Sequence, residues 1–261
     1  MVNYIKGGFL VNTDKKIVEK IYDDGAKGFV QESGTTLSLL PKTINAALVP
    51  LRKWIVEKEY SFKETQLLLE KKLKNIAVSE IVEPERYIAV PALQAISYSM
   101  DNETLRNMYA NLLANSMNVK VKDFVHPSFV DIIKQMSPSD AEIFNKICNS
   151  KIRPVIDLSI SFKNKRGNYN YLYSVTWLDS YDYEVVLISI SNLLRIGLIE
   201  INKGIEYTDD SNYDAVRKNS VYVHYKKSNE TDNNVTVNET KQFIKITPLG
   251  NLFYDICVKD C

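Results

Sequence analysis

The sequence has few of the residues that usually indicate a function. Its 261 residues include three cysteines and two histidines, and the formal net charge is +1. Cys148, Cys257 and Cys261 are widely spaced and odd in number, which argues against a disulfide framework and against a zinc site. No block of Lys and Arg stands out, so the charge does not indicate the counterion-release binding of basic nucleic-acid proteins.

Recognised catalytic motifs are also missing from the sequence. The glycines of "GAKGFVQESG" lack the Gly-Lys-Ser/Thr ending of a P-loop, and no Gly-x-Ser-x-Gly, His-Glu-x-x-His or paired-carboxylate motif occurs. We therefore predict a protein that is not an enzyme, with no catalytic residues, no metal and no cofactor. An unrecognised nuclease or other enzyme stays an alternative.

The most apolar stretch, residues 35–55, is too short and too interrupted to cross a membrane. Lys42 and Arg52 leave nine uncharged residues between them, whereas a spanning helix needs about 20 apolar residues. We favour a core helix of the N-terminal domain. The alternative is a segment on a membrane surface, with Trp54 at the interface and Lys42 and Arg52 toward lipid phosphates.

The N-terminus "MVNYIKGGFLVNTDKK" lacks the charged start and long apolar run of a signal peptide. The expected location is therefore the cytoplasm, with a peripheral position at the inner membrane as the alternative that residues 35–55 leave open.

The periodicity of apolar residues changes near residue 150. Up to Asn149 it is helical, with prolines between the helices, whereas "RPVIDLSISF" and "GNYNYLYSVTW" alternate with period two, as strands do. We predict a mainly α protein with a C-terminal α+β part. A helical, bundle-like domain would occupy residues 1–149 and a winged-helix-like domain residues 150–261.

Within the C-terminal part, alternation would place Tyr169, Tyr171, Tyr173, Val175 and Trp177 on one face of a strand. A helix over residues 183–196, ended by Gly197, should lead into the strand "LIEI". We expect residues 228–240 to be a loop or wing tip and "KQFIKI" to be a strand. Thr247 and Pro248 should then open a last helix. This order is typical of winged helices.

Residues 83–141 carry several helix boundaries. Pro91 is expected at a first helical position, Asp101 as an N-cap, and Pro127 at the start of the next helix. "SPSD" from Ser137 should open another helix through a capping box. Four short helices would make this stretch a compact helical unit.

The motifs in the same stretch resemble a known family. "EPERYIAVPALQAI", "LRNMYANLLA" and "HPSFVDIIKQ" look like the bacterial abortive-infection alpha proteins, formerly a domain of unknown function, as do the later "LLRIGLIE" and "TPLG". The resemblance implies a role in phage defence, with residues 83–141 as the core motif, and does not imply a catalytic residue set.

The resemblance is densest at polar and loop residues that a core alone does not require. We therefore predict that two turns come together on one surface and bind a protein partner of host or phage origin. The candidate contact residues are Glu83, Pro84, Tyr87, His126, Pro127 and Ser128. For His126, a role at the helix start is favoured over catalysis.

A transcription regulator that binds DNA through the winged helix is the main alternative. The helix that would enter a groove offers Ser189, Ser191, Asn192 and Arg195, which is little for base readout. We expect weak or no binding to duplex DNA and favour a winged helix that contacts protein, with a second copy of the chain as another candidate partner.

Overall fold

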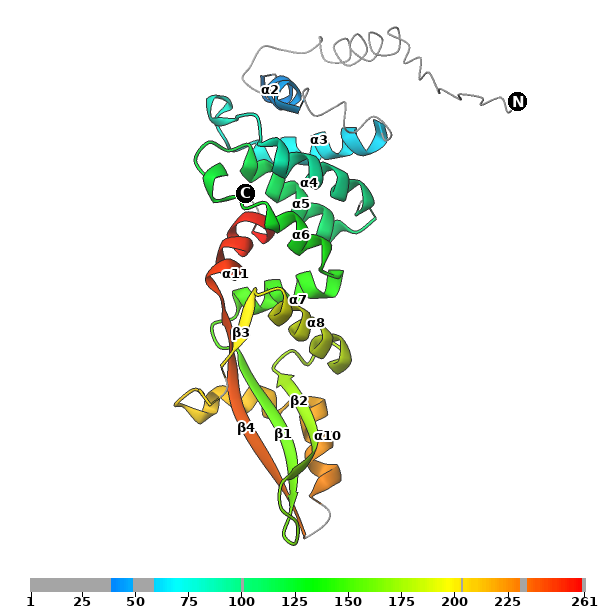
Figure 1. The fold of residues 1–261 in the computed structure, drawn as a ribbon, viewed down its shortest axis with the longest axis vertical. Coiled ribbons are helices and arrows are strands. Elements are labelled where there is room, and N and C mark those ends of the chain that lie inside the picture. Colours follow the sequence, from blue (N-terminus) through cyan, green and yellow to red (C-terminus); the bar gives the residue numbers. More distant parts are fainter. Residues whose placement is uncertain (1–38, 49–58, 100, 203, 231–233, 260–261) are drawn as a thin grey trace, which may run out of the picture. The chain divides into compact units, whose positions relative to one another are not determined.

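The computed structural model describes residues 39–48, 59–99, 101–202, 204–230 and 234–259. The chain divides into two compact units, Met1–Leu39 and Leu40–Cys261. Leu39 is the single described residue of the first unit, and all other described residues belong to the second (Figure 1). The predicted domain boundary at residue 150 lies inside this second unit and stays a prediction.

Helices dominate the first half of the described chain, and a sheet with further helices follows. The helices are α2 (Leu39–Leu48), α3 (Glu59–Leu73), α4 (Arg86–Tyr98), α5 (Glu103–Ser116), α6 (Ser128–Lys134), α7 (Pro138–Asn149), α8 (Tyr183–Arg195), α9 (Asp214–Arg217), α10 (Ser220–Asn229) and α11 (Pro248–Phe253). Short helical segments are η3 (Val78–Glu80), η4 (Lys122–Phe124), η5 (Asp210–Tyr213) and the π-helical η6 (Tyr254–Val258). The strands are β1 (Pro154–Phe162), β2 (Asn168–Thr176), β3 (Ile199–Ile201) and β4 (Val235–Ile246).

Local capping explains where several helices begin. At α7, the Ser137 side chain accepts the N–H of Asp140 at 3.1 Å and Asp140 accepts the N–H of Ser137 at 2.7 Å, which confirms the predicted capping box. At α11, the Thr247 side chain accepts the N–H of Gly250 at 2.9 Å. The cap of α5 is Asn102 and not Asp101, because the Asn102 side chain accepts the N–H of Leu105 at 2.9 Å.

Pro91 is not at a first helical position, as the sequence suggested, but inside α4, which begins at Arg86. A proline there cannot donate to the carbonyl of Tyr87. The helix nevertheless continues to Tyr98, because Ala89, Ala92 and Leu93 are buried in the main core and tertiary packing offsets the missing bond.

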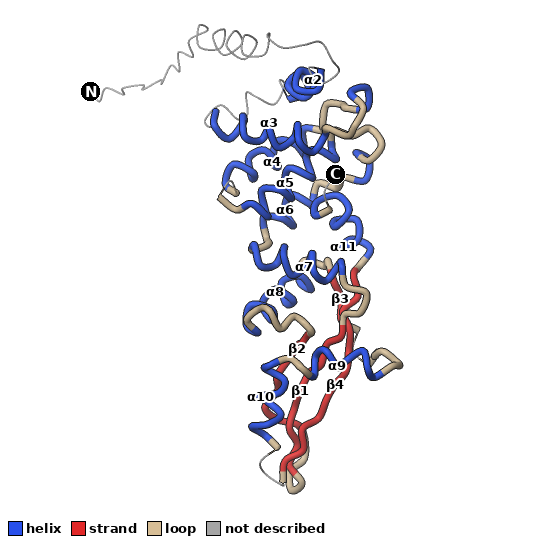
Figure 2. Tube along the Cα trace, turned by 180° about the vertical axis from the view of Figure 1, so that it is seen from behind, coloured by secondary structure: helices blue, strands red, loops and turns tan. Residues whose placement is uncertain are grey.

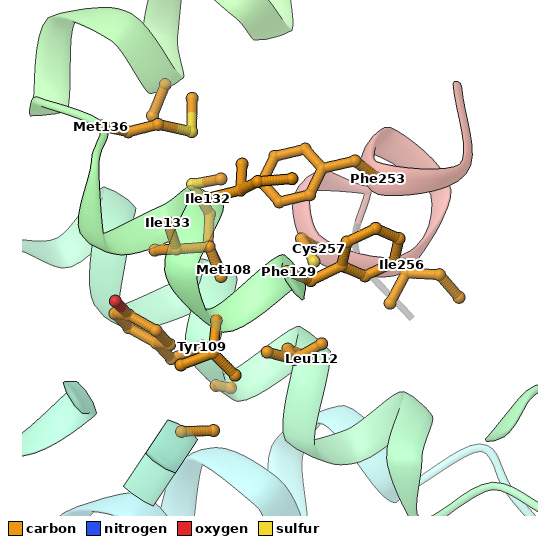
Figure 3. Packing of buried hydrophobic residues seen from close by; sticks show 14 of the residues in the cluster. Met108, Tyr109, Leu112, Phe129, Ile132, Ile133, Met136, Phe253, Ile256 and Cys257 are labelled. Carbon is orange, nitrogen blue, oxygen red and sulfur yellow. The ribbon is translucent and has the colours of Figure 1, made fainter. Parts of the chain in front are cut away.

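The main core is built around α5. This helix buries Met108 through Ser116, and it packs against α3, α4 and α6. The C-terminal segment α11–η6 packs on the same helix, and Figure 3 shows Phe253, Ile256 and Cys257 close to Phe129 and Leu112. Phe129 and Phe253 meet edge to face, with ring centroids 5.5 Å apart.

Two buried asparagines of α5 bind the backbone of this C-terminal segment. Asn111 donates from Nδ2 to the carbonyl of Cys257 at 3.1 Å, and Asn115 donates to the carbonyl of Ile256 at 2.8 Å. The residues after 150 therefore contribute directly to the core of the helical part.

The four strands form one antiparallel sheet in the order β2-β1-β4-β3, so β2 is an edge strand. The residue pairs Ile156–Val175 and Leu158–Leu172 contribute to a second core, which includes Tyr213, Val216 and Tyr222 of the segment from η5 to α10. Helices α9 and α10 therefore cover one face of the long strands (Figures 1 and 2).

The predicted common face of the β2 residues is wrong. Tyr169, Tyr171 and Tyr173 are 42%, 48% and 51% exposed, whereas Val175 is buried. The register with β1 shifts twice along β2, and Ser174 has a φ of +52°. Each shift adds one residue to β2 relative to β1. The side chains of β2 beyond the shift therefore lie on the opposite face from the one that simple alternation predicts.

The predicted loop over residues 228–240 is wrong for its second half. Val235–Ile246 is one long strand that pairs with β1 from Phe162 to Pro154. The Asn and Thr content favoured a loop, but Val235 and Val237 alternate with polar residues, and the β-branched residues of "VTVNET" suit the pleated surface.

The structure is mixed α and β with a C-terminal antiparallel sheet, and the winged-helix assignment is not confirmed. Helix α8 leads into β3 past Gly197, whose φ is +75°, and β3 pairs with β4 as wing strands would. However, residues 202–234 separate these two strands and carry η5, α9 and α10. In a simple wing, the two strands follow each other directly.

Candidate functional site

The turn that begins at Glu83 leads into the first turn of α4. Glu83, Glu85 and Arg86 are exposed, and Pro84 is buried and anchors the turn. Tyr87 is 62% exposed, although the residues that follow it in the helix, Ile88 and Ala89, are buried. The Arg86 Nε lies 4.0 Å from Glu83 Oε1, a contact of two well-exposed side chains that contributes little stability.

The second turn, His126 to Ser128, begins α6. Nδ1 of His126 accepts the Ser128 N–H at 3.2 Å and lies 2.7 Å from the Ser128 hydroxyl oxygen. His126 and Pro127 are exposed. The histidine therefore acts at the helix start, as the favoured interpretation predicted.

The helix order brings the two turns toward the same end of the helical layer. Ile81 and Asn118 form an isolated antiparallel bridge, in which Val82 donates to the carbonyl of Met117 at 2.8 Å. The start of α4 is thereby held at the end of α5, and the chain from Asn118 continues through η4 directly into α6. Direct contact between the two turns stays a prediction.

Exposed apolar side chains border both turns. Phe124, two residues before His126, is 60% exposed, and Val119 is 43% exposed. Lys120 forms a 2.5 Å ion pair with Glu80 beside the bridge. We call Glu83, Tyr87, His126, Pro127 and the partly buried Ser128 the α4–α6 turn surface. Pro84, the sixth predicted contact residue, is buried and does not belong to it.

Other motif residues have architectural roles. The Thr247 hydroxyl donates to the carbonyl of Gly197 at 2.6 Å, and the Thr247 N–H donates to that of Leu198 at 3.1 Å. A Cβ on Gly250 would lie 2.0 Å from the Leu198 carbonyl oxygen, which leaves no room for another residue. The "LLRIGLIE" and "TPLG" segments thus meet through close backbone contacts.

Two of the four α8 residues expected for base readout, Asn192 and Arg195, bond to residues before α7 or in it, whereas Ser191 is exposed and bonds only within α8. Asn192 donates to Asp140 Oδ2 at 2.9 Å and to the Gln135 carbonyl at 2.8 Å. Arg195 donates to Asn192 Oδ1 at 2.7 Å and to Gln135 Oε1 at 2.8 Å, and Ser189 is buried. Ile188, on the same helix, is 68% exposed.

Several groups with shifted pKa values belong to an ion-pair network that the sequence did not indicate. Arg217 binds Asp210 through two bonds of 2.8 and 3.0 Å and Glu239 through bonds of 2.9 and 3.3 Å. Tyr222 donates to Glu239, and Lys241 lies 2.7 Å from Asp210. The network joins η5, α9 and α10 to β4, and each charged group in it has a partner.

These contacts set the pKa values of the two carboxyl groups. Hydrogen bonds from Arg217 and Lys241 hold the pKa of Asp210 well below its usual range. Burial alone would raise the pKa of Glu239, but hydrogen bonds from Arg217 and Tyr222 outweigh it and lower the pKa. Both groups are therefore stabilised as carboxylates, which fits an architectural role and not a general acid.

The cysteines that the structure describes resemble core residues. Cys257 is fully buried and Cys148 is half-buried on α7. Burial raises the pKa of the Cys148 thiol to about 12, against the opposing effect of Arg153. Such a thiol is a poor nucleophile near neutral pH.

The predicted membrane-surface residues are only partly described. Lys42 is exposed on α2, whereas Ile44 and Leu48 of the same helix are fully buried. Arg52 and Trp54 lie outside the described residues. None of the described helices combines the length and apolar character needed to cross a bilayer.

The described residues contain no group of three or more His, Cys, Asp and Glu side chains placed to hold a metal ion. The residues predicted to contact a partner lie in two turns of the helical part, and the described chain is mixed α and β. The family model described as abortive infection alpha matches residues 57–257, and the chain belongs to this family. No curated protein and no solved structure matches the chain.

Proposed function

We propose that the protein is a non-enzymatic phage-defence protein that acts in the cytoplasm through contact of its α4–α6 turn surface with a host or phage protein. Membership of the abortive infection alpha family supports the defence role. The proposal adds the mode of action and the place of contact.

The exposure of Tyr87 is the observation that carries this proposal. Tyrosine is enriched among the residues that dominate protein interfaces, because it offers a large rigid area with a polar end. Here the ring is 62% exposed at the start of a helix whose next two residues, Ile88 and Ala89, are buried. An exposed ring at this position contributes little to the core.

The roles of the other motif residues support the same location. Asn111 and Thr247 bind backbone carbonyls, and Gly250 permits a close backbone approach. Glu83 and Pro127 are instead exposed, and His126 uses one ring nitrogen locally and leaves the rest of its ring accessible. Exposed motif residues in turns are more often explained by contacts than by packing.

The engaged side chains of α8 weigh against the DNA-binding alternative. Asn192 and Arg195 would have to abandon bonds to Asp140 and Gln135 before they contacted bases. The second form of the proposal is that the protein contacts a membrane surface, for which the exposed Lys42 of α2 is a candidate.

Photo-crosslinking during infection tests the contact directly. A photoreactive phenylalanine analogue replaces Tyr87 in one variant and Val223, which is 50% exposed on α10, in a matched control. We expect a discrete crosslinked protein from position 87 in infected cells and none from position 223. Equal crosslinking at both positions, or none at position 87 while the variant still protects, contradicts the proposal.

A further inference from the structure

The sheet face opposite α9 and α10 carries a stacked pair of exposed tyrosines. Leu172 packs on the second core beneath those helices, and side chains alternate along a strand, so its neighbours Tyr171 and Tyr173 project from the other face. Their rings are nearly parallel, at 7°, with centroids 5.4 Å apart. Both rings are about half exposed.

The surroundings of this pair are polar, and the adjoining turn is basic. The nearby carboxylate of Asp157 is already engaged, because it accepts the Ser174 N–H at 2.7 Å and a bond from Gln242 Nε2 at 2.8 Å. On the neighbouring strand β1, Ser159 and Ser161 alternate with the core residues Leu158 and Ile160. Lys163, Lys165 and Arg166 are exposed in the turn that joins β1 to β2. The whole stretch from Leu158 to Thr176 contains these three basic residues and no acidic residue.

We propose that this face binds single-stranded nucleic acid, with bases stacked on Tyr171 and Tyr173 and phosphates bound by Lys163, Lys165 and Arg166. Exposed aromatic rings beside a local basic cluster are the combination that single-strand binding uses, because every base has a face that can stack. The site is separate from the α4–α6 turn surface and does not depend on the proposed function.

Two features favour a single strand over other occupants. Bases of a duplex are stacked on each other and present only their edges, so they cannot stack on the tyrosine pair. A peptide strand added to the edge of β2 would need a regular backbone, whereas the two register shifts and the positive φ of Ser174 disturb this edge. The chain as a whole is also nearly neutral, so the attraction is confined to the hairpin.

Fluorescence anisotropy with the full chain tests the proposal. The probes are labelled 20-nucleotide oligo-dT and oligo-rU and a duplex of the same length, each at about 0.1 M salt. We expect both single strands to bind more tightly than the duplex, and the ratio of the two affinities shows whether DNA or RNA is preferred. Equal or tighter binding of the duplex, or no binding of either single strand, overturns the proposal.

Substitutions locate the binding to this face. Replacing either tyrosine by alanine should weaken binding roughly 5- to 150-fold, the range known for loss of one base–aromatic stack, whereas Tyr→Phe should retain most of the affinity. Tyr87→Ala, which removes an exposed tyrosine elsewhere, should leave the affinity unchanged. All these variants should melt close to the temperature of the parent protein, because each replaced ring is about half exposed or more.

The basic turn has its own readout. Lys163→Gln with Lys165→Gln should weaken binding and reduce the salt dependence, since each phosphate contact contributes about 0.7 to the slope of log affinity against log salt for single strands. If the tyrosine variants bind as the parent does, or the glutamine variant keeps the full salt dependence, the hairpin is not the binding site.

Discussion

Asn192 on α8 and Asp140 on α7 are joined by a hydrogen bond of 2.9 Å between the amide nitrogen and Oδ2. The same carboxylate oxygen accepts the N–H of Ser137 at the start of α7. Asp140 is 4% exposed, so one buried carboxylate both caps α7 and fixes α8 against it. Asn192, one of the four α8 residues expected for base readout, is therefore held against α7.

Asn192→Ala should lower the free energy of unfolding by about 1–3 kcal/mol, because it leaves the buried Asp140 carboxylate with one partner fewer. Urea unfolding followed by circular dichroism measures this change. Ser191→Ala is the control, since that hydroxyl is exposed and donates only to the Leu187 carbonyl of its own helix. Equal stability of the two variants would mean that the contact with α7 contributes little.

Duplex DNA binding should be weak and lost near physiological salt. Arg195→Ala should not change it, because the guanidinium is engaged with Asn192 and Gln135. Anisotropy titrations with duplex DNA at two salt concentrations measure both expectations. A sequence-selective, salt-tolerant complex that Arg195→Ala abolishes would instead support the transcription regulator.

Asn111→Ala should destabilise the docking of η6 on α5. The buried carbonyl of Cys257 loses its side-chain donor, and the expected cost is about 1–3 kcal/mol. Compared with the parent protein, the variant should show faster hydrogen exchange in Tyr254–Val258 and little change in β1. Asn251→Ala, an exposed asparagine of α11, serves as the control, and unchanged exchange in Asn111→Ala would contradict the assigned role.

Acid should weaken the attachment of α9 and α10 to the sheet. The pKa values of Asp210 and Glu239 are lower in the folded protein than in the unfolded chain, where they are about 3.9 and 4.3. The two ionised carboxylates therefore stabilise the fold above these unfolded values, and this stabilisation is lost as the pH falls below them. Arg217→Met should therefore be less stable than the parent at pH 7, with a difference that shrinks below about pH 4. A difference independent of pH would show that the ion pairs do not contribute.

Cys148 should react slowly with thiol reagents in the native protein. Burial raises its pKa to about 12, so very little thiolate is present at pH 8. Peptide-resolved mass spectrometry compares labelling in buffer and in urea, and Cys257 gives an internal reference for a fully buried thiol. Rapid native labelling of Cys148 would reopen the interpretation of this residue as a nucleophile.

Sequence reasoning succeeded where the controlling interaction is local. The capping box of Ser137 and Asp140, the cap at Thr247 and the left-handed Gly197 depend on residues within one helical turn or on one backbone angle. These features follow from side-chain chemistry and spacing alone.

It failed where residues far apart in the sequence decide the outcome. Asn111 and Cys257 are separated by 146 positions, and no periodicity indicates that they meet. Register shifts moved Val175 away from the tyrosines, and pairing with β1 turned the expected loop at residues 235–240 into strand. In the candidate site, Glu83, Tyr87, His126 and Pro127 are exposed, whereas Pro84 is buried, contrary to its predicted contact role, and partner contact by the turns stays a prediction.

The central claim is that the α4–α6 turn surface makes the contact on which defence depends. The double variant Glu83→Ala with His126→Asn tests it in a phage plaquing assay, because asparagine retains an acceptor for the Ser128 N–H and thus keeps the start of α6. Leu112→Ala, at a fully buried position, is the comparison and should lose about 2–5 kcal/mol of stability together with protection. The account predicts that the double variant loses protection with a nearly unchanged melting temperature. Normal protection by the double variant, or loss of protection only together with unfolding, would contradict it.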